Sequence, residues 1–241
     1  MAELTSGATT TEDGTGSYLI TSGPKADQMQ TASYIAHALK MCGAAKPRLA
    51  YIGAATDDSL QFLSWVEPML VEAGAGAIDL VPLAREDADI DAAKKLLADA
   101  DAVFVSGGDP ARGMEWLYRH EGICDYLREL FAEGKLFCGI SAGPIMMGER
   151  WFAFEGADGG WSSVDPGDGS AARLIDCLGL VPYSFDAHGE EEGWADLRRM
   201  LSLTGPGEHA LGLPLGGMAY CDRDGVPTSL CNARFQAMPW A

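Results

Sequence analysis

The chain has 241 residues, with 17 Lys and Arg against 35 Asp and Glu, so its formal net charge is −18. A protein this acidic repels phosphate groups, which excludes non-specific binding to nucleic acid or to anionic lipid. Its hydrophobic residues (47%) and charged residues (22%) match an average globular protein, and the length suits one large domain. No stretch approaches the roughly 18 apolar residues of a membrane span, and no basic segment followed by an apolar run opens the chain. We therefore expect a cytoplasmic protein without nucleic acid or membrane partners.

Cysteine and histidine are too scattered to build a metal centre. None of the six cysteines forms a CxxC pair and most lie in apolar runs, so we expect buried, reduced thiols. Four histidines leave few ways to build a His-rich metal site. The sequence thus predicts neither a metal nor a cofactor.

The N-terminal part of the chain alternates apolar runs with helical periodicity. Residues 1–16 are rich in Thr, Gly and acid, and we expect them to form a flexible tail. Strands are predicted over residues 17–22, 48–54, 77–83, 101–107 and 136–140, and helices over residues 26–41, 60–72, 91–100, 111–118 and 122–132. Strands separated by helices imply right-handed crossovers. Residues 17–241 are therefore expected to form a single α/β domain with a mostly parallel sheet, helices on both faces and flavodoxin-like layering.

The pattern changes after Ser141. A helical stretch over 144–151 precedes residues 155–170, where Gly, Asp and Ser show no periodicity and predict a long loop of the kind that often carries function. Residues 177–188 are expected to form a strand and a turn, and residues 191–203 an amphipathic helix. Asp224-Gly225 between apolar runs is typical of a hairpin turn, which predicts a C-terminal hairpin.

The segment Gly139-Ile140-Ser141-Ala142-Gly143 has the form of a nucleophile elbow. It follows an apolar strand and precedes a helical stretch, and its small residues permit the sharp turn that exposes a serine hydroxyl. A GxSxG pattern also occurs by chance, as a tight turn with a capping serine. The context favours Ser141 as a nucleophile.

A second glycine-rich loop, Ser106-Gly107-Gly108-Asp109-Pro110, ends the preceding strand. Because the carboxyl ends of parallel strands meet at one edge of a sheet, this loop and Ser141 should face the same crevice. A backbone N–H of the glycine pair could then approach a substrate carbonyl as an oxyanion donor. The alternative is a simple turn before a helix with Pro110 at its first position.

His188 is the best placed base for Ser141. A serine at its normal pKa is a poor nucleophile and needs a base from a loop at the same sheet edge. His188 follows an apolar segment, whereas the other three histidines lie within a helix, at a helix end or before a strand. We expect structural or surface roles for those three.

Four segments, RLAYIGAAT, VFVSGGD, CGISAG and LGLVPYSFDAHG, together resemble the S51 serine peptidases, a family that includes dipeptidase E and cyanophycinase. The resemblance runs from about Ser17 to the C-terminus and implies a class I glutamine amidotransferase-like fold. It implies that Ser141 is the nucleophile and His188 the general base, and that the backbones of Gly108 and Ala142 form the oxyanion hole. The related amidotransferases have cysteine where Ser141 stands, which argues against glutamine hydrolysis.

The third member of a triad is harder to assign. Cyanophycinase takes an acid from a GLPEG-like strand, but this chain has Leu215 there, and Ala187 replaces the proline that usually precedes the histidine. Dipeptidase E takes its acid from the loop between nucleophile and histidine, which implies Asp158 here. The rival carboxylates are Glu155, Asp165 and Asp186.

These patterns favour a serine hydrolase that cleaves a short peptide or a related amide. By resemblance, Arg198 and Arg199 would recognise an acidic N-terminal residue, although they equally fit a solvated pair that answers nearby carboxylates. The alternative function is an impaired relative that binds a small ligand in the same crevice, and an ordinary α/β-hydrolase esterase is a third possibility. The acidic sequence favours neutral or basic substrates over Asp-X dipeptides. The sequence does not determine the oligomeric state, and a homodimer is one alternative.

Overall fold

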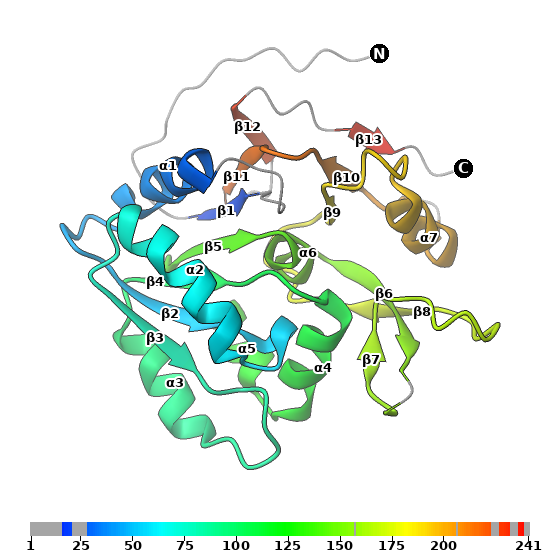
Figure 1. The fold of residues 1–241 in the computed structure, drawn as a ribbon, viewed down its shortest axis with the longest axis horizontal. Coiled ribbons are helices and arrows are strands. Elements are labelled where there is room, and N and C mark those ends of the chain that lie inside the picture. The colour runs from blue at the N-terminus through cyan, green and yellow to red at the C-terminus, as the bar shows by residue number, and fades with distance from the viewer. Residues whose placement is uncertain are drawn as a thin grey trace.

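The computed structural model describes residues 16–20, 28–156, 158–205, 207–222, 227–231 and 236–238. The expected tail at residues 1–15 lies outside the described residues, and Gly16 is the first residue of a strand. The main sheet has seven strands in the order β12 (Pro227–Cys231), β11 (Met218–Asp222), β1 (Gly16–Ile20), β5 (Leu136–Ile140), β4 (Ala102–Val105), β2 (Arg48–Ile52) and β3 (Ala77–Val81) (Figure 1). Neighbours from β1 to β3 pair in parallel, whereas β11 pairs antiparallel with both β1 and β12. The sheet is therefore mostly parallel, as predicted.

Helices cover both faces of this sheet. One face packs against α1 (Gln28–Lys40) and α2 (Leu60–Glu72), and the other against α3 (Ile90–Asp99), α4 (Pro110–Arg119), α5 (Ile123–Ala132) and α6 (Ala142–Met147). Central strands are apolar at every position because alternate side chains enter opposite cores. Tyr51 and Phe104 stack at 5.9 Å on the α1 side, while Phe137 meets Phe131 of α5 edge to face at 5.8 Å on the other.

A second group of strands lies beyond the main sheet. One three-stranded sheet contains β13 (Gln236–Met238), β10 (Ala210–Leu213) and β9 (Ser184–Ala187), and another contains β7 (Trp161–Ser162), β6 (Arg150–Glu155) and β8 (Arg173–Asp176). Helix α7 (Ala195–Leu203) packs against strands of both. No helix within the described ranges is long and apolar enough to cross a membrane.

The sequence-based prediction was wrong in this second region. The helix expected over 144–151 ends at Met147, and β6 follows from Arg150. A side chain at Gly148 would lie 2.6 Å from the carbonyl oxygen of Tyr183, so the chain turns where another segment presses on it. The loop expected over 155–170 contains β7, whose two residues pair with β6. Strands this short are defined by their neighbours and not by their own periodicity.

The C-terminal hairpin appears as the antiparallel pair β11 and β12, with Cys221 opposite Pro227. Its expected turn, Asp224-Gly225, lies outside the described residues. The five cysteines whose side chains are described are free, and burial raises the pKa of the Cys138 and Cys177 thiols.

Candidate active site

Ser141 occupies a strained turn between β5 and α6. Its φ of 52° and ψ of −106° are rare for a residue with a side chain. The turn is possible because its flanking glycines pack too closely for side chains. A Cβ at Gly139 would lie 3.0 Å from the carbonyl carbon of Gly143, and one at Gly143 would lie 2.4 Å from the oxygen of Val105. The local sequence thus builds the elbow that the GxSxG pattern predicted.

The Ser141 hydroxyl contacts His188. Ser141 Oγ lies 2.8 Å from His188 Nε2, the distance of a hydrogen bond. The His188 backbone also has a positive φ, 52°, and its N–H donates to the carbonyl of Leu213 at 2.8 Å. The structure therefore brings together the predicted nucleophile and the predicted base.

The prediction that Ser141 and His188 lie at the edge of the same sheet was wrong. His188 follows β9 of a three-stranded sheet and does not come from the edge of the main sheet. Helix α6, which begins directly after Ser141, packs against β9 and joins the two sheets at this point. Packing between sheets, rather than a shared sheet edge, brings the imidazole to the hydroxyl.

Gly108 and Ala142 are the predicted oxyanion donors. Both line the same pocket as Ser141, and within the described residues neither backbone N–H donates a hydrogen bond. Gly108 has a φ of 133°, and a Cβ there would lie 2.2 Å from the oxygen of Ala55, so only glycine fits. Two backbone N–H groups therefore remain available beside the hydroxyl.

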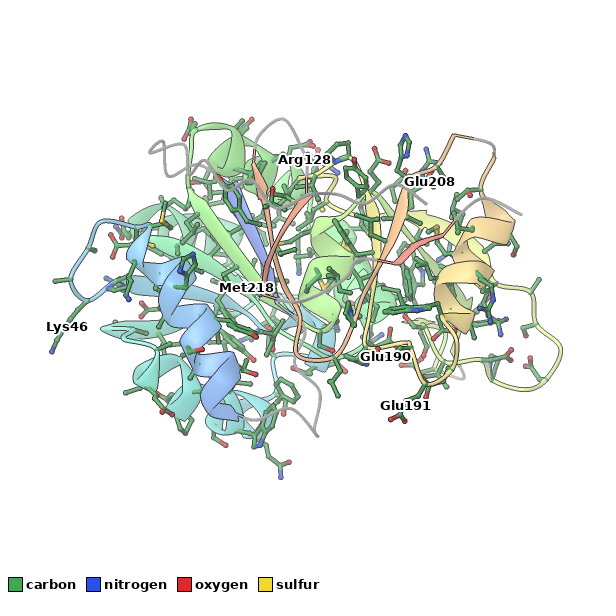
Figure 2. All side chains as sticks on the ribbon, turned by 90° about the horizontal axis from the view of Figure 1, so that it is seen from above. Lys46, Arg128, Glu190, Glu191, Glu208 and Met218 are labelled. Carbon is green, nitrogen blue, oxygen red and sulfur yellow. The ribbon has the colours of Figure 1, made fainter. Side chains whose placement is uncertain are left out.

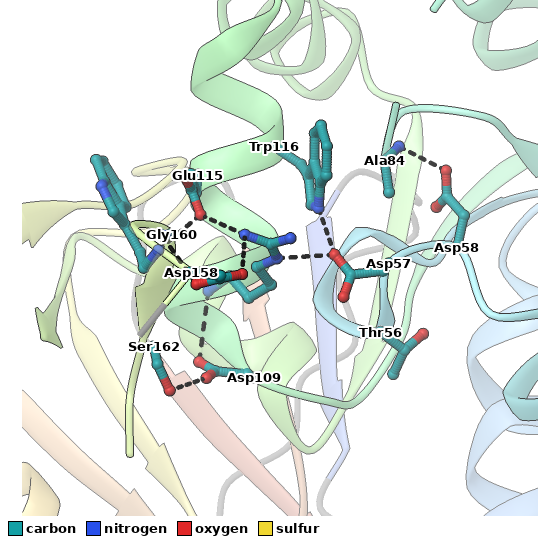
Figure 3. A network of polar contacts seen from close by, with 12 residues as sticks. Thr56, Asp57, Asp58, Ala84, Asp109, Glu115, Trp116, Asp158, Gly160 and Ser162 are labelled. Atoms are coloured by element: carbon teal, nitrogen blue, oxygen red, sulfur yellow. Dashed lines mark hydrogen bonds and ion pairs between the residues drawn. The ribbon is translucent and has the colours of Figure 1, made fainter. Parts of the chain in front are cut away.

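The structure does not bring the expected third residue, Asp158, to His188. Its Oδ1 accepts from the N–H of Gly160 at 3.0 Å, and its Oδ2 lies 3.8 Å from Arg112 Nη1 of α4. The Arg112 guanidinium thus holds Asp158 in another network, shown in Figure 3. The Gly160 hydrogen bond and the nearby Arg112 charge lower the pKa of Asp158.

The rival carboxylates do not contact His188 either. Glu155 is exposed at the end of β6, and Asp165 lies 3.5 Å from Arg199. Asp186 lines the pocket but forms no hydrogen bond with the imidazole. Within the described residues, His188 therefore has Ser141 as its side-chain partner and no carboxylate partner.

The pocket around Ser141 has a volume of about 390 Å³. It is lined by Gly108, Pro110, Ser141, Ala142, Ile145, Trp151, Ser163, Asp186, Ala187, His188, Gly189, Glu192, Ala195 and Asp196. Three of these residues are acidic and none is Lys or Arg. The volume lies at the small end for ligand sites and suits a short substrate.

Asp186 is the most buried acid of this pocket, with 6% of its surface exposed. Burial, together with the negative charges of Asp196 and Glu192, raises its pKa to about 7, although backbone N–H groups of Ala187 and Leu197 oppose the shift. Burial also raises the pKa of Asp196. The pocket thus holds carboxylates that are costly to ionise.

Arg198 and Arg199 do not line the pocket. Arg198 donates to the carbonyl of Gly193, and Arg199 pairs with Asp165 and lies 5.1 Å from the ring centroid of Phe154. Their positions fit the alternative reading of a basic pair that answers nearby groups.

Sequence reasoning missed the pocket wall made by Trp151 and Ser163. Trp151 Nε1 donates to Ser163 Oγ at 3.1 Å, and Ser163 Oγ donates to Asp109 Oδ1 at 2.7 Å. Trp151 lies in the stretch 144–151 that was predicted to be helical, and Ser163 lies in the expected loop over 155–170. The only available signal was the length of the supposed loop.

Comparisons with known proteins identify the family and the fold. The family described as peptidase family S51 matches residues 18–203. The fold is similar to that of a peptidase from an acI-B1 Actinobacterium, with a TM-score of 0.61 and 14% identity over 93% of this chain and 97% of the other. It is also similar to a peptidase E-like protein from Listeria monocytogenes EGD-e, with a TM-score of 0.59 and 13% identity over 93% and 98%. No curated protein sequence matches the chain significantly.

Proposed function

Because this chain belongs to peptidase family S51, we propose that it is a serine peptidase that cleaves short peptides or related amides through an acyl-enzyme on Ser141. The observation that carries the proposal is the 2.8 Å contact between Ser141 Oγ and His188 Nε2. It supports transfer of the hydroxyl proton to the imidazole as the oxygen attacks a carbonyl carbon.

Each group of the site then has a defined role in the reaction. Ser141 Oγ bonds to the substrate carbonyl carbon, and His188 Nε2 takes the hydroxyl proton. The N–H groups of Gly108 and Ala142 stabilise the negative oxygen of the tetrahedral intermediate. His188 next gives its proton to the leaving amine as the carbon–nitrogen bond breaks. A water molecule, deprotonated by His188, hydrolyses the ester and restores Ser141.

A dyad without an orienting acid favours a second candidate function. Loss of a correctly placed acid costs about 10⁴ in kcat in a serine protease. No described carboxylate bonds to His188, and Leu215 stands where an acid would otherwise lie. The second candidate is therefore a relative that binds a small ligand in this pocket without turning it over.

Labelling of Ser141 separates the two candidates. We expect a fluorophosphonate to label the wild type but not Ser141→Ala, and peptide turnover to fall by about 10³-fold or more in that variant. Ser64→Ala, which removes an exposed hydroxyl on α2, should label and turn over normally. An unlabelled wild type, or full turnover in Ser141→Ala, would contradict the peptidase mechanism.

A further inference from the structure

One wall of the active-site pocket is acidic. It is formed by Asp186 at the end of β9, Glu192 in the turn that follows and Asp196 in the first turn of α7. Figure 2 shows two further acids of that turn, Glu190 and Glu191, at its surface. Within the described residues, none of the three wall carboxylates forms an ion pair with Lys or Arg. The charge of Arg199 acts on Asp196 from outside the pocket, whereas no Lys or Arg lines the pocket itself.

Asp186 is the buried member of this acidic wall, whereas Glu192 and Asp196 are exposed. It is 94% buried, since only 6% of its surface is exposed, yet it lines the cavity. Its carboxylate accepts from the backbone N–H groups of Ala187, at 2.8 Å, and of Leu197, and within the described residues it forms no ion pair. A buried carboxylate is strongly disfavoured unless a cation or several donors compensate it. A ligand with a positive charge would provide a cationic partner for the Asp186 carboxylate.

We infer that this pocket binds a cationic group of the substrate, an ammonium or guanidinium, on the acidic wall formed by Asp186, Glu192 and Asp196. The inference rests on the proposed function, because it assigns the substrate class of the Ser141 site. An ammonium group provides three donors and a guanidinium five, and carboxylate oxygens form strong, charge-assisted hydrogen bonds with such groups. An N-terminal Asp would instead bring a fourth carboxylate to this wall. The cation has two possible sources, the α-ammonium of a peptide or the side chain of Lys or Arg.

Binding to Ser141→Ala tests the inference without requiring hydrolysis. Calorimetry at pH 7.5 would compare Lys-Ala, norleucine-Ala and Asp-Ala, each with a free and an acetylated N-terminus. We expect a cationic ligand to bind about tenfold or more tightly than acetyl-norleucine-Ala, because a hydrogen bond to a charged group is worth that factor. A preference for free over acetylated peptides identifies the α-ammonium, and a preference for Lys over norleucine identifies the side chain. Equal affinities throughout, or tightest binding of acetyl-Asp-Ala, would overturn the inference.

Substitutions of single carboxylates then show which residues cause the preference for cationic ligands. In the Ser141→Ala background, Asp186→Asn should abolish the preference for cations, whereas Asp91→Asn, an exposed acid at the start of α3, should retain it. Asp196→Asn changes an exposed helix position and should weaken the preference about threefold, which tests the wall should Asp186→Asn fail to fold. A preference that survives in a folded Asp186→Asn and in Asp196→Asn would overturn the assignment to this wall. Cation binding without wild-type turnover would reject the peptidase proposal alone, and turnover indifferent to cations would reject this inference alone.

Discussion

Asp186 is a buried carboxyl group that has backbone N–H donors but no ion pair with a described residue. Its pKa is raised from the usual 3.8 to about 7, mainly by burial and then by Asp196 and Glu192. Residues chosen only for stability avoid this arrangement, because a neutral residue of the same shape would remove the cost. The carboxylate is therefore better explained by ligand binding than by folding.

Asp186→Asn should stabilise the free protein, and the gain should grow from pH 5 to pH 8. The unfolded chain releases the Asp186 proton near pH 3.8 and the folded chain near pH 7, so the wild type loses stability as pH rises through this window. Asn carries no charge and escapes this loss. Each pKa unit corresponds to about 1.4 kcal/mol, and we expect a gain of about 1–3 kcal/mol at pH 8.

Urea unfolding at pH 5, 6.5 and 8 measures this gain. Asp91→Asn, which removes an exposed charge, should show no comparable trend with pH. A folded Asp186→Asn that is less stable than the wild type at every pH would show that the carboxylate supports the fold.

At the scale of elements, the carboxylate of Asp109 joins two loops that form the pocket. It caps α4 by accepting from the N–H of Ala111 at 3.0 Å, and it also accepts from Ser163 N–H at 3.0 Å. Ser162 Oγ donates to the same carboxylate at 2.9 Å (Figure 3). Asp109 directly follows Gly108, whereas Ser162 and Ser163 belong to β7 and the residue after it. The Asp109 side chain thus links the loop of Gly108, an expected oxyanion donor, to the segment of Ser162 and Ser163.

We expect Asp109→Ala to lower kcat about tenfold with a smaller change in KM. Loss of the cap alone costs about 1 kcal/mol of stability, and the freed loops would misplace the Gly108 N–H, which acts in the transition state. The matched control is Asp89→Ala, which removes the cap of α3, where Asp89 accepts from Ala92 N–H at 3.0 Å.

Steady-state kinetics and thermal unfolding of the two variants separate the roles. Asp109→Ala should lose more stability than Asp89→Ala, because it also loses the hydrogen bonds to Ser162 and Ser163. Only Asp109→Ala should lose turnover at temperatures where both variants are folded. An equal effect of both variants on kcat would mean that Asp109 acts only through stability.

At the scale of the whole molecule, the site lies where separate sheets meet. Ser141 and Gly108 come from loops of the seven-stranded sheet, and His188 and Asp186 from the sheet of β9. The whole chain carries a net charge of −18, which adds a long-range field to the acidic wall. Substrate charge should therefore influence the encounter as well as the bound state.

The value of kcat/KM for a cationic peptide should fall as salt rises. The screening length shrinks from about 30 Å at 0.01 M to about 8 Å at 0.15 M, so attraction between the protein and a distant cation is lost. We expect a decrease of several-fold for Lys-Ala, which has a net positive charge, and almost none for norleucine-Ala, a zwitterion without net charge, measured at constant pH. A salt response shared by Lys-Ala and norleucine-Ala would contradict steering by charge.

The sequence by itself determined the elements whose formation depends on neighbouring residues. The spans of α2 and β5 were predicted at their observed bounds, because buried central strands are apolar throughout and helices show their period locally. The elbow at Ser141 was also predictable, since two small neighbours are what a strained turn requires. The position of His188 after an apolar segment, together with the family resemblance, identified it as the base, and it lies 2.8 Å from Ser141.

Only the tertiary structure decided what surrounds that pair. Asp158 was the expected acid, but it lies 3.8 Å from Arg112, 46 positions earlier in the chain, and does not contact His188. Asp186 enters the pocket because β9 pairs with β10 and packs against α6, and no local pattern records either contact. The charge of a pocket depends on segments that meet across the fold, whereas periodicity and turn chemistry report only on residues a few positions apart.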